Sequence, residues 1–294
     1  MNEGNERERR VEEEETVEQE VGEISKDEVR EALKRMKNGK LATPPRTSAP
    51  VSARLLSWLL PPPSHQVMKE IQSAMATAAS DDSKMVLLGA VGSVFCCGLD
   101  FLYFIRRLTD DRKKESIKMA ETIRTFVNTF IQFRKPIVAA VNGPAVGLGA
   151  AILPLCDVVW ANEKAWFQTP YTAYGQTPDA CSSFTFPRIM GLASANELLL
   201  SGRKLTAQEA CSKGLVSQVL WPGTFTQEVM VRIKELVTVD SLVLRESKAL
   251  MRNTSRSALE QANERECESL KRVWGSSQGT DSILQYLQRR TELC

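Results

Sequence analysis

Two glycine-containing stretches, SVFCCGLDF at residues 93–101 and NGPAVGLGA at residues 142–150, each directly follow a short apolar run. Such runs are typical of buried strands, and ligands of α/β proteins bind beyond the carboxyl ends of parallel strands, so both stretches point to one site. In the second stretch Leu148 lies between two glycines where a helix is expected to begin. A helix start offers main-chain N–H groups without partners. The pattern therefore predicts a main-chain site that stabilises negative charge developing on an oxygen; alternatively, the glycines only permit close packing of strand and helix.

Charge is unevenly distributed along the 294 residues, whose formal net charge is +2. Residues 1–31 hold 13 acidic and 5 basic side chains, a net charge of −8, so the remaining residues carry +10. Because the lysines and arginines are scattered rather than gathered in a dense run, this excess suits an anionic small molecule. We expect no direct binding of nucleic acid.

Histidine and cysteine usage excludes several kinds of site. The chain has one histidine, His65, and seven cysteines without a C-x-x-C motif. A Ser-His-Asp or Cys-His catalytic group therefore has no suitable base, and we expect neither a metal site nor a disulfide framework. Cys96 and Cys97 are expected to be small packing residues.

A membrane span is also not expected. Residues 136–156 are uncharged and long enough to cross a bilayer, but Pro136, Pro144 and Pro154 would break the helix that a bilayer requires. The N-terminus is charged and has no apolar segment typical of a signal peptide.

Four regions are expected along the chain. Residues 1–23 are a Glu-rich acidic tail that we predict to be disordered. Residues 24–40 predict one short amphipathic helix; they also resemble the segment ahead of the reverse-transcriptase domain in non-long-terminal-repeat retrotransposons, which suggests a chimeric transcript or gene model, with an unrelated helix as the alternative. Residues 41–64 are a Pro-rich linker, and residues 65–294 form a single domain, with a core to about residue 220 and a helical C-terminal part from about 221.

Within this domain, apolar runs alternate with amphipathic segments, which predicts α/β layering around a parallel sheet. Strands are expected in KMVLLGAV, KPIVAAV and CDVVWA, with helices in VMKEIQSAMATAA and ESIKMAETIRTFVNTFIQF. Further helices are expected at 192–200, 206–213, 225–237, 241–252, 255–273 and 280–290.

Three long segments, SVFCCGLDF, residues 135–191 and LSGRKLTAQEACSKGLVSQV, resemble the crotonase (enoyl-CoA hydratase/isomerase) superfamily, and most closely its chromodomain Y-like members. The resemblance implies the ClpP/crotonase fold, a spiral of ββα units with a helical C-terminal region. It also implies that the domain binds coenzyme A or acyl-CoA, with main-chain N–H groups forming an oxyanion hole for the thioester carbonyl of acyl-CoA. By position these N–H groups belong to Leu99 and Leu148. The residues expected to line the bound ligand are Cys97, Gly98, Gly147, Gly149 and Tyr171.

The resemblance also indicates which catalytic groups are missing. Hydratases of the superfamily carry two carboxylates at the positions of Ala151 and Tyr171, and the loss of each acid-base group costs about 10²- to 10⁴-fold in rate. At most weak crotonyl-CoA hydration is therefore expected. Asp179 matches the region where Δ3,Δ2-enoyl-CoA isomerases carry a glutamate that moves the proton between carbons 2 and 4; alternatively, it caps a helix N-terminus.

Three functions stay open. The resemblance implies a nuclear, chromatin-associated corepressor module that binds acyl-CoA and corepressor proteins and forms a homotrimer. The second is an isomerase that uses Asp179, for which the cytoplasm or the peroxisome is the alternative location. The third is a non-functional truncated fusion, since LLSWLLPPPS replaces the first strands of the fold and has no strand signal.

Overall fold

The computed structural model describes residues 53–58, 65–279, 281–283 and 285; for 53–58 and 101–112 it describes the main chain alone. The predicted acidic tail and the predicted helix at 24–40 lie outside the described residues, as does most of the predicted helix at 280–290. The proposed domain bounds remain predictions.

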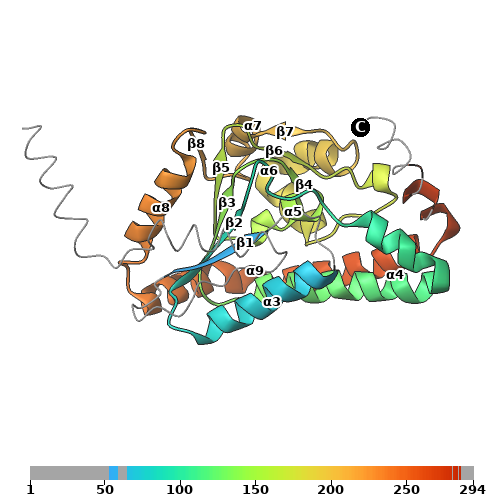
Figure 1. Ribbon diagram of the computed structural model, residues 1–294, viewed down its shortest axis with the longest axis horizontal. Coiled ribbons are helices and arrows are strands. Elements are labelled where there is room, and N and C mark those ends of the chain that lie inside the picture. The colour runs from blue at the N-terminus through green and yellow to red at the C-terminus, as the bar shows by residue number, and fades with distance from the viewer. Residues whose placement is uncertain (1–52, 59–64, 280, 284, 286–294) are drawn as a thin grey trace, which may run out of the picture.

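A parallel five-stranded sheet forms the centre of the fold (Figure 1). Its strand order is β1-β2-β3-β5-β8, and every neighbouring pair is parallel. Three of these strands were predicted from their apolar runs. The bounds are β1 Ala53–Trp58, β2 Met85–Ala90, β3 Ile137–Val141, β5 Val158–Asn162 and β8 Gln218–Leu220.

Helices cover both faces of this sheet (Figure 1). Successive side chains of a strand point to opposite faces, so Val86 and Leu88 pack into the larger core while Met85 and Leu87 pack into a smaller one. The larger core is covered by α3 (His65–Ser80), α4 (Phe101–Gln132) and α9 (Ser241–Trp274), and the smaller core by α8 (Phe225–Leu236). The shorter helices are α5 Leu148–Ala151, η1 Leu153–Leu155, η2 Thr172–Tyr174, α6 Ser182–Leu199 and α7 Ala207–Ser212.

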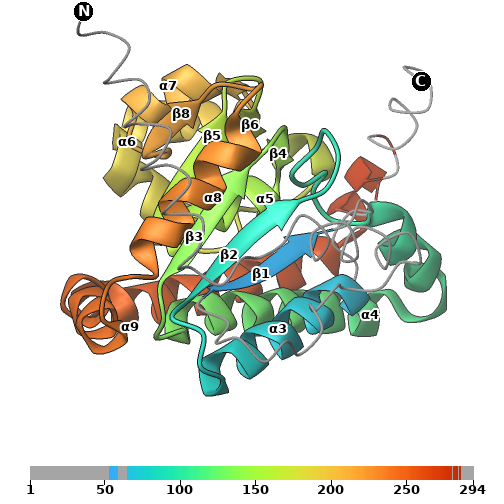
Figure 2. The ribbon, with the colours of Figure 1, turned by 60° about the vertical axis from the view of Figure 1, so that its left-hand side comes forward.

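The two longest helices, α4 and α9, pack along each other beneath the sheet (Figure 2). The prediction of separate helices at 241–252 and 255–273 is wrong, because α9 is continuous across the intervening residues. Asn, Thr and Ser are weak helix formers and favoured a break at this place. Tertiary packing outweighs that preference, since Leu259, Ala262 and Leu270 of α9 are all buried in the core.

The region before α3 holds one strand where none was expected. β1 pairs in parallel with β2 along its whole length, from Ala53 beside Met85 to Trp58 beside Ala90. The expectation that this part of the chain lacks a strand is therefore wrong for residues 53–58. The sequence ARLLSW has only one β-favouring aromatic residue and no β-branched residue, and three prolines follow closely, which hid the signal.

The remaining short elements complete the fold around the two loops. A second sheet has the order β4-β6-β7, formed by Ala145–Val146, Trp166–Gln168 and Leu205–Thr206, and none of its strands was predicted. The predicted helix start at Thr206 is confirmed, since Thr206 and Glu209 form a reciprocal capping box. Among the helices in the described part of the chain, none combines the length and the apolar character that crossing a bilayer requires.

Candidate functional site

The two glycine-containing loops lie in direct contact. The first connects β2 to α4 and the second connects β3 to α5. Cys96 pairs with Ala145 as a parallel bridge, the N–H of Val146 donates to the carbonyl of Cys96 at 2.9 Å, and the N–H groups of Phe95 and Cys96 both donate to the Pro144 carbonyl at 3.0 Å. The main chain of each loop is therefore fixed against that of the other.

Glycine is required at the closest points of this contact. Gly147 has φ 56°, a left-handed conformation that glycine adopts without steric cost. A Cβ on Gly147 would lie 3.6 Å from the Cα of Gly98, which itself has φ 82°. A Cβ on Gly143 would lie 1.9 Å from the carbonyl oxygen of Ser93, so no side chain fits there without moving the loops apart.

The main-chain amides of Leu99 and Leu148 lie on these two loops, one on each. Leu148 is the first residue of α5, which follows Gly147, and the N–H groups of a first helical turn have no acceptor within the helix. Leu99 follows Gly98 in the first loop. Within the described part of the chain, neither N–H donates a hydrogen bond to a protein acceptor. Two free donors on touching loops are the elements of an oxyanion hole.

The thiol of Cys96 fills the space between the loops. Its pKa is raised to about 12 by burial, although the main-chain amides of Gly98 and Gly149 act in the opposite direction. A protonated, buried thiol is not a nucleophile at neutral pH, so Cys96 serves packing, as expected. Cys97, which was assigned to the ligand site, is partly exposed beside it.

Asp179 lies at the centre of a buried polar cluster. Tyr171 donates its hydroxyl to Asp179 Oδ1 at 2.5 Å, and Gln176 Nε2 lies 2.7 Å from Asp179 Oδ2. The exposed fractions of Asp179 and Tyr171 are both 1%. The alternative interpretation, that Asp179 caps a helix, is wrong, because α6 begins after Cys181 and no side chain caps it.

Burial is the main influence on the ionisation of this cluster. It raises the pKa of Asp179 to about 7, with the charge of Glu266 acting in the same direction; the hydrogen bonds from Tyr171 and Gln176 lower it. The pKa of Tyr171 is raised well above its usual value, first by burial and then by Asp179. Asp179 also raises the pKa of the Cys96 thiol, as the smallest of the influences on that group after burial. A carboxyl that titrates near neutrality is suited to accept and return a proton.

Two members of the cluster were missed by the sequence analysis. Gln176 stands three residues before Asp179, and this spacing was a local signal for a shared contact. Glu266 comes from α9 and had no sequence signal; its carboxylate accepts from the N–H of Cys181 at 2.6 Å and from the N–H of Ser183 at 2.9 Å. Burial raises the pKa of Glu266 as well.

The positions matching the hydratase carboxylates cannot supply an acid-base pair. Ala151 is fully buried in α5, and the hydroxyl of Tyr171 is directed at Asp179. Tyr171, which the sequence analysis predicts to line the ligand, is hydrogen-bonded to Asp179.

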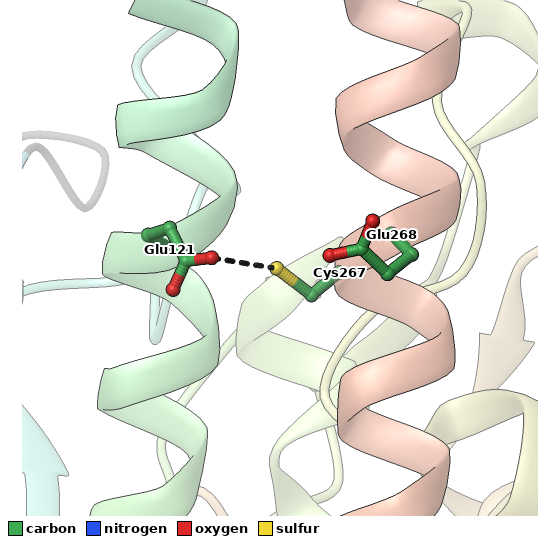
Figure 3. Close-up of side chains that lie close together, drawn as sticks. All are labelled: Glu121, Cys267 and Glu268. Carbon is green, nitrogen blue, oxygen red and sulfur yellow. Dashed lines mark hydrogen bonds between the residues drawn. The ribbon is translucent and has the colours of Figure 1, made fainter.

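Outside this site, Glu121 on α4 faces Cys267 and Glu268 on α9, a group with the ligand types of a metal site (Figure 3). The ammonium of Lys271 pairs with both carboxylates, at 2.7 Å from Glu268. Burial raises the pKa of the Cys267 thiol to about 11. The position that a cation would take is therefore held by a lysine, and we interpret this group as a junction between α4 and α9.

Asp157 has a structural role away from the two glycine loops. Its Oδ2 accepts from the N–H of Ile137 at 2.8 Å and lies 2.7 Å from Lys248 Nζ, and its Oδ1 lies 3.1 Å from Arg252 Nε. Lys248 also donates to the carbonyl of Lys135 at 2.8 Å. This network attaches α9 to the start of the central strands.

The sequence matches the family Enoyl-CoA hydratase/isomerase over residues 64–292. The chain belongs to this family. Among family members, the chain is 76% identical to the chromodomain Y-like protein of Rattus norvegicus over 227 residues, which is 77% of this chain and 38% of that protein. It is 40% identical to enoyl-CoA delta isomerase 2 of Rattus norvegicus over 228 residues, 78% of this chain and 58% of that protein. The chain thus spans less than half the length of its chromodomain Y-like relatives.

A solved enoyl-CoA hydratase/isomerase from Pseudoalteromonas atlantica superposes with a TM-score of 0.71 and 27% identity, covering 80% of this chain and 94% of that one. The predicted resemblance to the enoyl-CoA hydratase/isomerase family and the predicted α/β crotonase fold are both confirmed. The assignments of individual site residues remain predictions.

Proposed function

We propose that this chain is a nuclear, chromatin-associated corepressor module that binds coenzyme A thioesters between its two glycine loops. One observation carries the binding step: the N–H groups of Leu99 and Leu148 are free of protein acceptors in the described structure while their loops touch. Two such donors suit the carbonyl oxygen of a thioester. The identity to chromodomain Y-like proteins supports the chromatin role. A homotrimer and contacts with corepressor proteins belong to the same proposal.

At most weak hydration of crotonyl-CoA follows from the same geometry. Water addition needs one group to activate water and another to deliver a proton. Ala151 has no such group, and the Tyr171 hydroxyl is engaged with Asp179. The only contribution to the rate of hydration that we then expect is polarisation of the thioester carbonyl by the N–H groups of Leu99 and Leu148.

The binding step is tested by removing the N–H of Leu148 and comparing the result with a control variant that keeps this N–H. Proline lacks the N–H and is tolerated at the first position of a helix, which Leu148 occupies. Leu148→Pro and Leu148→Ala both lose the leucine side chain, but only the first loses the N–H. We expect calorimetric affinity for crotonyl-CoA to fall about tenfold further in Leu148→Pro than in Leu148→Ala, with affinity for free coenzyme A less affected. Equal affinities of the two variants would refute the oxyanion hole.

The chromatin role has a separate test. The chain, tethered to a promoter in cells, is expected to lower reporter transcription and to fractionate with chromatin. A chain that binds crotonyl-CoA but leaves transcription unchanged would retain the binding proposal and refute the corepressor role.

A second candidate function is the isomerisation of Δ3-enoyl-CoA with Asp179 as the base. The specific support is a buried carboxyl with a pKa of about 7 that is hydrogen-bonded to Tyr171, together with 40% identity to an enoyl-CoA delta isomerase. The base would remove a proton from carbon 2 of the substrate and return it to carbon 4. We expect Asp179→Asn to abolish any isomerisation and to spare crotonyl-CoA binding. Unchanged isomerisation would remove Asp179 from the mechanism.

The third hypothesis, a non-functional fusion, predicts a chain without cooperative unfolding. β1 pairs along the whole of β2, which argues against a missing sheet edge. A single cooperative thermal transition is the result that our proposal requires.

A further inference from the structure

A cavity of about 480 Å³ lies between the end of α4 and the first half of α9. The residues that line it lie toward the start of β3, because α4 leads into that strand. The two glycine loops follow the opposite ends of β2 and β3; Figure 2 shows the direction of these strands. Small-molecule sites in proteins have volumes of about 300 to 1,000 Å³. The cavity is thus large enough for a ligand and separate from the proposed acyl-CoA site.

Its lining combines an apolar floor with cationic walls. The floor includes Phe130, Leu155 and Leu259, which are buried. Of the described residues that line the cavity, one is acidic, Glu246, and five are cationic: Arg134, Arg245, Lys248, Arg252 and Arg256. Such a surface favours a molecule that has an apolar part and a negative charge.

Three of the five cations already have partners. Lys248 and Arg252 share Asp157, and the Arg252 guanidinium also donates to the carbonyls of Pro154 and Cys156. Arg256 pairs with Glu260 at 3.3 Å. Because their charges are already paired within the protein, we assign these three cations to the wall of the cavity and not to ligand recognition.

The remaining two cations, Arg134 and Arg245, are exposed. No carboxylate in the described part of the chain lies within ion-pair distance of either guanidinium. Asp240, five residues before Arg245, uses its carboxylate to accept from two main-chain amides at the start of α9. Arginine binds phosphate and carboxylate through two parallel hydrogen bonds.

We propose that this cavity binds an amphipathic organic anion, whose phosphate or carboxylate contacts Arg134 and Arg245 and whose apolar part lies on Phe130, Leu155 and Leu259. The ion pairs with Asp157 keep the cavity formed when it is empty. The site requires no covalent step and is independent of the glycine loops.

Calorimetric titration of the whole chain with naphthyl phosphate and with naphthoate tests the proposal and distinguishes the two anionic groups. At least one of these probes is expected to bind, and naphthol, which has no charge, is expected to bind at least tenfold more weakly. Binding of naphthol as tight as that of the anions, or no binding of either anion, would overturn the proposal.

The variant Arg134→Gln/Arg245→Gln locates the site. We expect it to weaken binding of the anion by about tenfold or more, since each arginine contributes charged hydrogen bonds. Arg265→Gln removes an exposed arginine elsewhere on α9 and is expected to leave binding unchanged. The three substituted arginines are all exposed, so the melting temperature should change little in all variants. Equal affinity of the double variant and the Arg265→Gln control would exclude this cavity as the site.

Discussion

Gly149 lies so close to Cys96 that a Cβ on the glycine would be 2.3 Å from the Cβ of Cys96 and 2.5 Å from its sulfur. Real Cβ atoms do not approach other atoms this closely, so the two loops pack at a distance that leaves no room for a side chain at position 149. The distance between the loops, and therefore the separation of the two proposed amide donors, depends on glycine at position 149.

Gly149→Ala is therefore expected to separate the loops. The added methyl group meets a buried side chain and would force a backbone shift, which costs about 1 to 3 kcal/mol in the free energy of unfolding. Calorimetry should show that affinity for crotonyl-CoA is lost to a greater extent than stability, because the amide donors move apart.

Gly223→Ala is the matched control for this change. A Cβ on Gly223 would meet only the exposed side chain of Trp221, at 3.3 Å, and no atom of either glycine loop lies within 4 Å of it. Its effect on unfolding and on ligand affinity should be small. If Gly149→Ala behaved like this control, the loops would not be held as the structure has them.

The ionisation of Asp179 predicts a specific pH dependence of stability. Because burial raises its pKa from 3.8 to about 7, the folded chain binds more protons than the unfolded chain between these values, and stability falls as pH rises through this window. About three pKa units correspond to about 4 kcal/mol. Asp179→Asn should remove much of this slope in urea unfolding measured from pH 4 to 8, and should make the chain more stable than the parent above pH 7.

Glu266 remains in that variant, and its own raised pKa leaves a residual slope. Asp82→Asn, the same substitution at an exposed position, should preserve the full slope. A parent chain whose stability is flat across the window would show that Asp179 is not buried as described.

The sequence was sufficient for the parts of the fold whose signals are local. Apolar runs located β2, β3 and β5, and the capping pair Thr206 and Glu209 located α7. The glycines of the two loops identified the main-chain contact, because close approach of backbone to backbone excludes side chains. Family resemblance then supplied the positions of the two amides.

Contacts between distant segments could not be predicted in the same way. Glu266 reaches the start of α6 from a helix more than eighty residues away, and no local pattern marks it. β1 depends on pairing with β2 rather than on its own propensity. The continuity of α9 likewise comes from packing along α4, which outweighs its weak helix formers.

Among the residues that attach α9 to the central strands, Asp157 is expected to contribute most to the free energy of unfolding. Asp157→Ala would leave the buried ammonium of Lys248 without its carboxylate and the N–H of Ile137 without an acceptor. Removal of one partner from a buried ion pair costs about 3 to 5 kcal/mol. Urea unfolding should show a loss in this range. The loss should be smaller at high pH. Burial lowers the pKa of Lys248 and Asp157 opposes that shift, so without Asp157 the lysine loses its proton at a lower pH. The neutral amine then needs no carboxylate partner.

The exposed pair between Glu197 and Arg203, 2.9 Å apart, provides the comparison. Surface pairs contribute about 0 to 1 kcal/mol, so Glu197→Ala should change stability within that range. Similar losses for Asp157→Ala and Glu197→Ala would indicate that the Asp157 network is as open to solvent as the surface pair.

Tyr171→Phe should move the ionisation of Asp179 without removing the carboxyl. The hydroxyl of Tyr171 donates to Asp179 and lowers its pKa, so its loss raises that pKa above about 7 while the ring keeps most of the packing. The pH range in which stability falls should therefore extend upward, and any isomerisation, which needs ionised Asp179, should reach its half-maximal rate at higher pH. In an Asp179→Asn background the same change should have no effect on either pH profile, because no carboxyl remains to respond. A pH shift that persists in that background would assign the effect to a group other than Asp179.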